Sequence, residues 1–462
     1  MFKHTLAFEY KTCKVDKGGS VFTLHRPCFR VNMTGGLYSE PMSNQTTSRQ
    51  AYINWFLLSL FFAYQYLLRG YPGIFTSEIR GTFHVDATRY SDLGAWCMFA
   101  YSLLQIPFGM LLDRIGVRRV VLTAFALCLV GQYTFTHAQT FETALFGRLL
   151  LGIGATPGYM SALKLVVDSF TEKSCGLFIG LTGAFGNISL ALCEPRLKAV
   201  GLAHDDWRFP ALYLNVAGIL IFIACAFLLK PEKIVKKKPS HNEPLPKNSF
   251  WKNVIGVALN YKVYLYALLI IGTNILAAIL VDLWGKSFLN AKYHLSEQEA
   301  INTVQWIQIG RLAANIILPL MFAETRLLLG IRISCASLVF IFSFLIYGPQ
   351  ILSENILRFL LFGVGFFGNA DALIFTLGAK LSTPQTSGMI ISWINSVSMF
   401  GEPVLQKWIG VALDKHWSGL SDADGLRIYQ ASDYECAMSV MLKVVCVCFV
   451  IACLMRNKKQ TA

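Results

Sequence analysis

Long apolar runs separated by short polar stretches dominate the chain. A helix that crosses a bilayer needs about 20 predominantly apolar residues, and twelve runs approach or exceed that length. They lie near residues 51–75, 91–112, 119–137, 142–167, 176–200, 208–230, 259–284, 299–322, 327–347, 354–379, 387–412 and 436–456. The pattern predicts an all-α polytopic membrane protein with twelve transmembrane helices.

A polar stretch after the sixth run divides the chain six plus six. Residues 231–258 carry three consecutive lysines, Lys236 to Lys238, several prolines and little apolar content, which is typical of a solvated linker. We therefore expect an N-terminal six-helix bundle over residues 51–230 and a C-terminal six-helix bundle over residues 259–456. Tails of residues 1–50 and 457–462 flank them.

Lysine and arginine concentrate in the N-terminal tail, the linker and the last residues of the chain. Such residues accumulate on the cytoplasmic side of membrane proteins. An even number of spans separates the three segments, so we expect both termini and the linker to be cytoplasmic.

The first 41 residues need a separate interpretation. They lack the uninterrupted apolar core of a signal peptide, and Pro41 is followed directly by Met42. We interpret residues 1–41 as a disordered tail or an over-extended reading frame, with an ordinary cytoplasmic tail as the alternative.

Composition agrees with the pattern. Hydrophobic residues make up 54% of the chain and charged residues 15%, which is too apolar for a soluble protein. The net charge of +14 lies in tails and short loops, so it indicates membrane topology and not a nucleic-acid partner. The 12 cysteines are scattered without metal-site spacing, so we expect no metal and no cofactor.

Two weak internal repeats support a duplicated architecture. Each motif recurs about 210 positions later, in the matching run of the second half. In the first repeat, Asn187 and Glu194-Pro195 recur as Asn395 and Glu402-Pro403. In the second, Gly152-Ile-Gly154 recurs as Gly363-Val-Gly365.

A short charged turn separates the second and third apolar runs. It reads Gly109-Met-Leu-Leu-Asp113-Arg114-Ile-Gly116-Val-Arg118-Arg119. The glycines let helix ends approach closely, and Asp113 beside three arginines forms a charge cluster that can be held or released. The spacing G-x3-D-R-x-G-x-R-R resembles the signature of the major facilitator superfamily of secondary transporters.

The resemblance implies two six-helix pseudo-repeats with helices one, four, seven and ten around a central cavity. It also implies that the turn is a cytoplasmic latch between two access states, formed by Gly109, Asp113, Arg114, Gly116, Arg118 and Arg119. Two further strings, Tyr64-Gln-Tyr66-Leu-Leu-Arg69 and Gln105-Ile-Pro107-x-Gly109, resemble the branch that contains bacterial phagosomal nutrient transporters and lysosomal dipeptide carriers.

Charged residues inside the apolar runs are the main functional candidates, because an ionisable group in the hydrocarbon region costs several kcal/mol unless it faces a cavity or a partner. Arg69 precedes Gly70-Tyr71-Pro72-Gly73, which should break or kink the first helix. We expect Arg69 to bind an anionic group such as a carboxylate; the alternative is an arginine that snorkels to the membrane interface.

Other candidates follow from the helix positions that the resemblance implies. The predicted substrate-binding residues are Arg69, Tyr64, Tyr66, Asn274, Asn369 and Asp371, with Trp306 as a further aromatic candidate. Asp282 could be a site or an interfacial residue, and the latter is favoured. Glu194 could lie at the outer membrane edge, because Arg196 and Lys198 follow it.

Three residues are predicted to couple transport to protons. Asp371 lies near the middle of the tenth run, and Glu402 precedes a proline in the eleventh. Arg148, in Arg148-Leu-Leu-Leu-Gly152, resembles the arginine of the fourth-helix motif of the superfamily, often linked to proton coupling. A structural hydrogen bond to helix ends is the alternative for Arg148.

The predicted function is secondary active transport of a small polar, carboxylate-bearing solute by alternating access and proton symport, in a bacterial inner membrane. Amino acids or short peptides are the favoured solute classes, and nucleosides and citrate-type siderophores rank after them. The expected partners are the solute, protons and the bilayer, and the protein is expected to be a monomer. The chain contains no G-x4-G-K-[S/T] loop, so ATP is not the direct driver.

Two alternatives stay open: a proton-driven exporter of a siderophore or drug, and a transport-dead membrane sensor. An enzyme is disfavoured, because the sequence contains no histidine cluster and no G-x-S-x-G motif.

Overall fold

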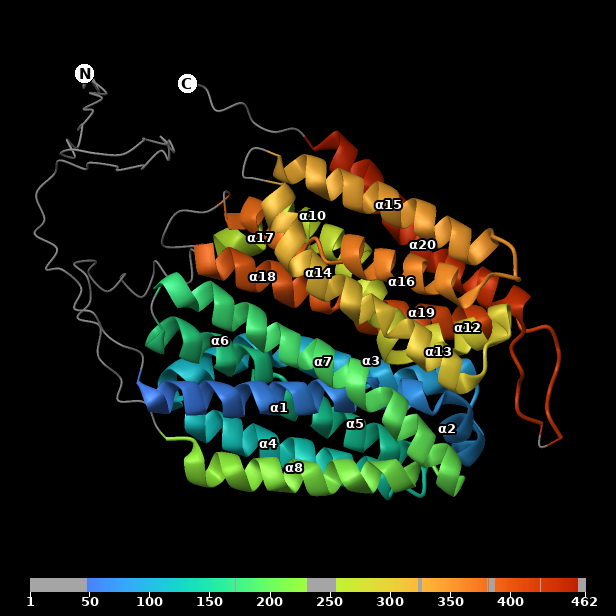
Figure 1. Cartoon of the computed structure of the whole chain (residues 1–462), viewed down its shortest axis with the longest axis horizontal. Coiled ribbons are helices and arrows are strands. Elements are labelled where there is room, and N and C mark those ends of the chain that lie inside the picture. Colours follow the sequence, from blue (N-terminus) through green and yellow to red (C-terminus); the bar gives the residue numbers. More distant parts are fainter. Residues whose placement is uncertain are drawn as a thin grey trace, which may run out of the picture. The chain divides into compact units, whose positions relative to one another are not determined.

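The computed structural model describes residues 48–170, 172–230, 255–322, 326–379, 381, 387–423 and 425–455, apart from some side chains such as that of Asp113. This part of the chain is almost entirely helical (Figure 1). The α-helices are α1 (Arg49–Ile74), α2 (Thr76–Phe83), α3 (Ala87–Ile115), α4 (Val117–Thr136), α5 (Phe141–Ala155), α6 (Pro157–Ser169), α7 (Glu172–His204), α8 (Arg208–Leu228), α10 (Tyr261–Ile270), α11 (Leu276–Ile279), α12 (Gly285–Tyr293), α13 (Glu297–Val304), α14 (Trp306–Met321), α15 (Leu327–Tyr347), α16 (Glu354–Gly368), α17 (Asp371–Ala379), α18 (Ser387–Met399), α19 (Gly401–Lys415) and α20 (Ala431–Leu454), and the π-helices are η1 (Ile271–Ile275) and η2 (Leu280–Trp284).

Within these described ranges, ten helical runs are long and apolar enough to cross a membrane. They match every predicted span except the eighth and the eleventh. Each of those two places also contains a helix break, where α13 and α14 meet at Gln305 and where α18 and α19 meet at Phe400. Pro403, just beyond the second break, lacks the N–H that would bond back across it. The all-helical membrane fold is confirmed, and the count of twelve spans stays a prediction.

The first helix does not break at Gly70–Gly73, as the sequence suggested. It continues to Ile74 with Pro72 inside its last turn. Proline removes the hydrogen bond to the carbonyl four residues earlier, here that of Leu68. The Nη1 of Arg148 donates to this carbonyl at 2.7 Å. The helix is not broken here, and a side chain from α5 supplies a donor where the proline lacks its N–H. The alternative of a kink stays a prediction.

The helices pack in two groups that follow the order of the chain. In the first group α4 packs on α5 and α8, and α1 packs on α6 and α7; in the second, α14 packs on α16, and α15 on α20. In Figure 1 the first group is blue to green and the second yellow to red. Helix pairs α3 with α19, α1 with η2, and α7 with α14 connect the groups.

The predicted bundle boundaries stay a prediction. The tail of residues 1–50, the linker of residues 231–258 and the tail of residues 457–462 fall almost entirely outside the described residues.

The helix ends define two ends of the bundle. At the tail end, the Gln50 amide donates to the Leu228 carbonyl at 3.1 Å, and Nη2 of Arg332 donates to the Met455 carbonyl at 2.6 Å. These bonds place the start of α1 beside the end of α8, and the start of α15 beside the end of α20. The opposite end, where α1 ends and α3 begins, is called the far end.

The two groups are joined towards the far end. One apolar core cluster contains residues of both groups, and the rings of Tyr90 and Trp284 meet in it with their centres 5.8 Å apart. A second core cluster, from Val257 to Ala452, belongs to the second group alone. Gly73 packs so tightly on η2 that a Cβ would lie 2.4 Å from the Asp282 carbonyl oxygen. A larger residue at position 73 would force the groups apart.

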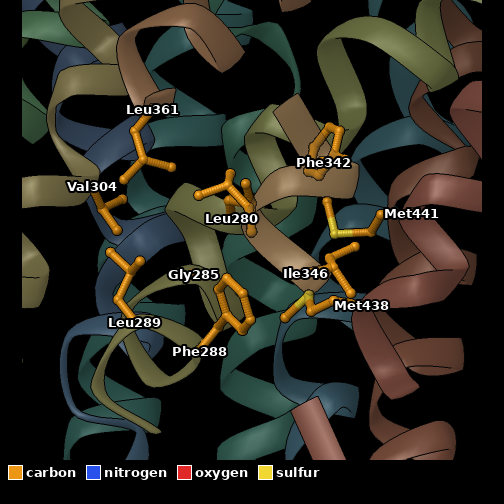
Figure 2. Close-up of a pocket in the computed structure, with 11 residues that line it drawn as sticks. Leu280, Gly285, Phe288, Leu289, Val304, Phe342, Ile346, Leu361, Met438 and Met441 are labelled. Carbon is orange, nitrogen blue, oxygen red and sulfur yellow. The ribbon is translucent and has the colours of Figure 1, made fainter. Parts of the chain in front are cut away.

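The second group also encloses a small apolar cavity of about 10 Å³ (Figure 2). Apolar side chains surround it, among them Phe288, Met438 and Met441. A buried water needs two to four polar partners, and these side chains supply none. The cavity is a packing gap and not a site for a polar solute.

Candidate functional site

Arg69 lies buried between two carboxylates of the other helix group. Its Nη2 atom is 3.2 Å from Oδ2 of Asp282 in η2 and 3.5 Å from Oε2 of Glu402 in α19. The rings of Tyr66 and Tyr101 lie 5.1 and 5.4 Å from its guanidinium carbon. The side chain therefore points between the groups. Asp282 is buried against Arg69, and its expected position at the membrane interface stays a prediction.

A second arginine lies next to this ion pair. The Nη1 of Arg311 in α14 donates to the hydroxyl of Tyr66 at 3.2 Å, and its Nη2 donates to the backbone and side-chain oxygens of Asn274 at 3.1 Å. The amide of Asn274 donates in turn to Oδ2 of Asp371. One cation and one anion are thus linked through a single asparagine.

Two polar atoms of this arrangement have no hydrogen-bond partner within the described part of the chain. The two are the buried Nε of Arg311 and the buried Oδ1 of Asp371, while Nε of Arg69 and Oε2 of Glu402 in the adjoining ion pair also have no hydrogen-bond partner among the described residues. An unsatisfied buried polar atom costs about 1–3 kcal/mol, and more when it is charged. A ligand with one acceptor and one donor would satisfy both atoms.

Tyr66 connects the two arginines, because its ring faces Arg69 and its hydroxyl faces Arg311. We call the connected residues Tyr66, Arg69, Asn274, Asp282, Arg311, Asp371 and Glu402 the central cluster. It has side chains from both helix groups and contains two arginines and three carboxylates. If every group were ionised, the net charge of the cluster would be −1. One additional proton would make the cluster neutral.

A buried ion pair adjoins the central cluster on its far-end side. Nζ of Lys286 in α12 lies 2.9 Å from Oε2 of Glu194 in α7, and Gln305 donates to the same oxygen at 2.7 Å. Glu194 is fully buried, and its Oε1 lies so near α1 that a Cβ on Gly70 would approach it to 2.7 Å. Glu194 therefore lies between the helix groups, and its expected position at the outer membrane edge stays a prediction.

The π-helices contribute to this arrangement. Asn274 lies in η1 and Asp282 in η2, within the helical run that begins as α10 and ends as α12. A π-turn inserts a residue into an α-helix, which rotates the side chains that follow, and such bulges are frequent at functional sites.

Most of the predicted substrate-binding residues lie together. Tyr66, Arg69, Asn274 and Asp371 belong to the central cluster, and the Asn369 amide donates to the carbonyl of Arg311 at 3.4 Å. Tyr64 does not join them. Its ring packs on Phe125 at 5.5 Å and its hydroxyl lies against Gly218, both inside the first group.

Arg148 contacts backbone and not carboxylates in the described part of the chain. Besides its bond to Leu68, it donates to the carbonyls of Arg69 at 2.9 Å and Leu93 at 3.0 Å. These bonds favour the structural alternative, and the coupling role of Arg148 stays a prediction.

Arg311 and Lys286 were missed among the candidates. Each is a cation inside or beside an apolar run, so the rule that identified Arg69 also applies to them. Arg311 was overlooked because it lies in the eighth run, and the resemblance directs attention to helices one, four, seven and ten.

The predicted latch lies at the tail end. Gly116 has a φ of +86°, a conformation that favours glycine and that allows the chain to turn directly from α3 into α4. Arg118 donates to the Ala226 carbonyl of α8 at 2.8 Å. Arg114 and Arg119 are exposed, Gly109 faces Met160, and the side chain of Asp113 lies outside the described residues. Among the described residues, no hydrogen bond or ion pair joins these side chains to the second group, so the latch role stays a prediction.

No set of metal ligands is found in the described ranges, where no three His, Cys, Asp or Glu residues gather in a way that could hold a metal ion.

Comparison with known proteins identifies the family. The model of the Major Facilitator Superfamily matches residues 51–404, and the chain belongs to this superfamily. It is a multi-pass membrane transporter of small-molecule solutes and not an enzyme.

Relatives are distant. The uncharacterized transporter YybO of Bacillus subtilis is 22% identical over 400 residues, 81% of this chain and 90% of that protein. The probable L-galactonate transporter of Escherichia coli is 29% identical over 182 residues, 39% of this chain and 40% of that protein. The nitrate/nitrite transporter NrtP of Nostoc punctiforme is 26% identical over 197 residues, 39% of this chain and 38% of that protein.

Solved structures show the same fold. A bacterial homologue of the human lysosomal transporter Spinster, inward-facing and unoccupied, aligns with a TM-score of 0.71 at 13% identity over 88% of this chain and 97% of that chain. The nucleoside transporter NupG aligns with a TM-score of 0.69 at 12% identity over 87% of this chain and all of that chain. The predicted branch of the superfamily stays a prediction.

Proposed function

We propose that this transporter moves a small carboxylate-bearing solute, an amino acid or short peptide, together with a proton. One observation carries the proposal: at either side of Asn274, Nε of Arg311 and Oδ1 of Asp371 are buried without hydrogen-bond partners among the described residues. The carboxylate of the solute binds Arg311, and its ammonium group binds Asp371. A zwitterionic solute thus satisfies a cation and an anion at once.

The charge balance of the arginines supports Arg311 as the carboxylate site. Arg69 already has two carboxylates at ion-pair distance, whereas Arg311 has none among the described residues. Arginine presents donors in a planar fork that matches a carboxylate. Two relatives are named for anionic solutes, L-galactonate and nitrate or nitrite, which agrees with a cationic binding residue.

The Arg69 ion pair supplies a route to proton coupling. Arg69 belongs to the first helix group, and Asp282 and Glu402 belong to the second. Separating the groups at the far end would leave two buried carboxylates without their cation, and such carboxylates take up a proton. We assign the transported proton to this carboxylate pair, with Asp371 as the competing position.

Alternating access then links the two ends of the bundle. The groups are joined at the far end, and we place the tail end, with both termini, in the cytoplasm of a bacterium. This arrangement corresponds to an inward-facing transporter in the inner membrane. The latch at Gly109–Arg119 would close the tail end when the far end opens.

Ligand binding to the purified full-length protein tests the proposal. We expect at least one amino acid or dipeptide to raise the melting temperature, and its carboxamide analogue, which lacks the carboxylate, to have no effect. Arg311→Gln should remove the shift, since an amide cannot replace the guanidinium charge. Arg358→Gln is the matched control, because Arg358 pairs with Glu354 on the same helix surface. A shift that survives in Arg311→Gln would contradict the proposed site.

A further inference from the structure

A second cavity, of about 260 Å³, lies at the far end between the helix groups. The end of α1 and α2 line it from the first group, and α12, α13 and the loop before α20 line it from the second. We call it the far-end cavity. Its volume is below the roughly 300–1,000 Å³ of pockets for drug-sized ligands, so it suits a solute of amino-acid size.

Arg80 is a buried cation in the wall of the far-end cavity. Its Nη2 donates to the carbonyl of Arg427 at 2.8 Å, and its Nε donates to that of Val85 at 3.4 Å. Its guanidinium carbon lies 4.6 Å from the centre of the Tyr429 ring. Its side chain is buried, and in the described ranges it forms no ion pair with a carboxylate. A buried cation without an acidic partner is costly unless an anion joins it.

The other cations in the wall are already balanced. Nη1 of Arg427 lies 3.0 Å from Oδ1 of Asp414, and Lys286 pairs with Glu194. Burial acts to raise the pKa of Asp414, but hydrogen bonds from Thr88, Tyr429 and Arg427 outweigh it, so this pKa lies below its ordinary value of 3.8. Asp414 is therefore ionised at neutral pH, and the charge of Arg427 is neutralised.

The acidic residues of the wall also have partners. Glu297 pairs with Lys198, and Asp422 accepts from the Leu426 amide within its own loop at 2.8 Å. Arg80 is thus the wall residue whose positive charge an anionic ligand would neutralise.

We propose that the far-end cavity is a second binding site for the carboxylate of the solute, with Arg80 as its principal contact. This inference rests on the proposed function, because it assigns the same solute class to the cavity. Lys286 lines the cavity and pairs with Glu194, which adjoins α1 one residue beyond Arg69. A solute leaving the far-end cavity would therefore meet this ion pair before it reaches the central cluster.

Calorimetric titration of the full-length protein in lipid nanodiscs tests the second site. The probes are L-alanyl-L-alanine, L-glutamate and L-galactonate. We expect the best of them to bind wild type with two equivalents, Arg80→Gln and Arg311→Gln with one each, and the double variant with none. Arg89→Gln is the matched control and should keep two equivalents, because Arg89 is half exposed and pairs with Glu142 at 2.5 Å outside the cavity.

The outcomes separate the two proposals. Equal stoichiometry in Arg80→Gln and wild type would overturn the far-end site and leave the central one. A single wild-type site that disappears in Arg80→Gln and persists in Arg311→Gln would overturn the central site and keep the far-end one. Absence of binding by all three probes would overturn both. If Arg80→Gln does not fold, Arg80→Lys replaces it. Lysine lacks the planar guanidinium fork, so the affinity of the second site should fall about tenfold. Unchanged affinity in this variant would contradict the assignment.

Discussion

At the scale of single residues, the function depends on which charges have partners. Arg69 shares two carboxylates, Arg80 has none within the described ranges, and Arg311 contacts Tyr66 and Asn274 instead. Removing one member of a buried ion pair usually costs about 3–5 kcal/mol, because it leaves the other charge uncompensated. Substitutions in the central cluster must therefore be assessed for stability as well as for transport.

Glu402 gives the most specific residue-level prediction. In Glu402→Gln the amide oxygen can still accept the bond from Gln406, which measures 3.1 Å, but the side chain can no longer exchange a proton. We expect the rate of solute exchange between equal concentrations to stay within about a factor of three of the wild-type rate. Accumulation of solute driven by a pH gradient should be abolished. Radiolabelled uptake into proteoliposomes measures both rates.

The comparison with Asp371→Asn locates the proton site. Wild-type accumulation in Glu402→Gln, together with loss of accumulation but retained solute exchange in Asp371→Asn, would move the proton to Asp371. Glu354→Gln is a surface control and should behave as wild type, since Glu354 pairs only with nearby Arg358 among the described cations.

Sequence reasoning identified part of the central cluster and none of its pairings. An ionisable residue in an apolar run is visible in the sequence, which is why Arg69, Asp371 and Glu402 were recognised. Whether Arg69 meets Asp282 depends on the rotation of η2, and a π-turn changes that rotation without leaving a clear periodic signal.

At the scale of elements, α1 depends on a side chain from α5. Arg148 supplies the hydrogen bond that Pro72 removes at the Leu68 carbonyl, and it also holds the Arg69 carbonyl. This contact fixes the turn of α1 from which Arg69 extends. The sequence revealed the proline and the arginine separately, but their relation requires the packing of α1 on α5.

A double-mutant cycle tests that relation. Arg148→Met should destabilise the protein by about 2–3 kcal/mol, because it leaves buried carbonyls without donors. In a Pro72→Ala background, the N–H of residue 72 can bond to Leu68 itself, so the same substitution should cost at least about 1 kcal/mol less. Equilibrium unfolding in mixed micelles measures both values. Additive effects would show that Arg148 does not act through the carbonyl that Pro72 frees.

At the scale of the whole molecule, the helix groups meet at the far end and the predicted latch lies at the tail end. Lys407 contributes to the far-end contact by pairing with Asp92 at 2.6 Å, and Thr88 donates to Asp414 at 2.7 Å. The helical membrane fold followed from apolar run lengths. The joining of the two helix groups at the far end did not, because it depends on contacts between distant segments that no local pattern encodes.

The central claim is that a carboxylate-bearing solute enters together with a proton through a site that contains Arg311. The most direct measurement is the pH inside proteoliposomes, followed with a trapped dye, after a solute found by the binding screen is added outside. We predict solute-dependent acidification in wild type and in Arg358→Gln, and at least a tenfold slower response in Arg311→Gln. Solute uptake without acidification, or equal acidification in Arg311→Gln, would contradict the account.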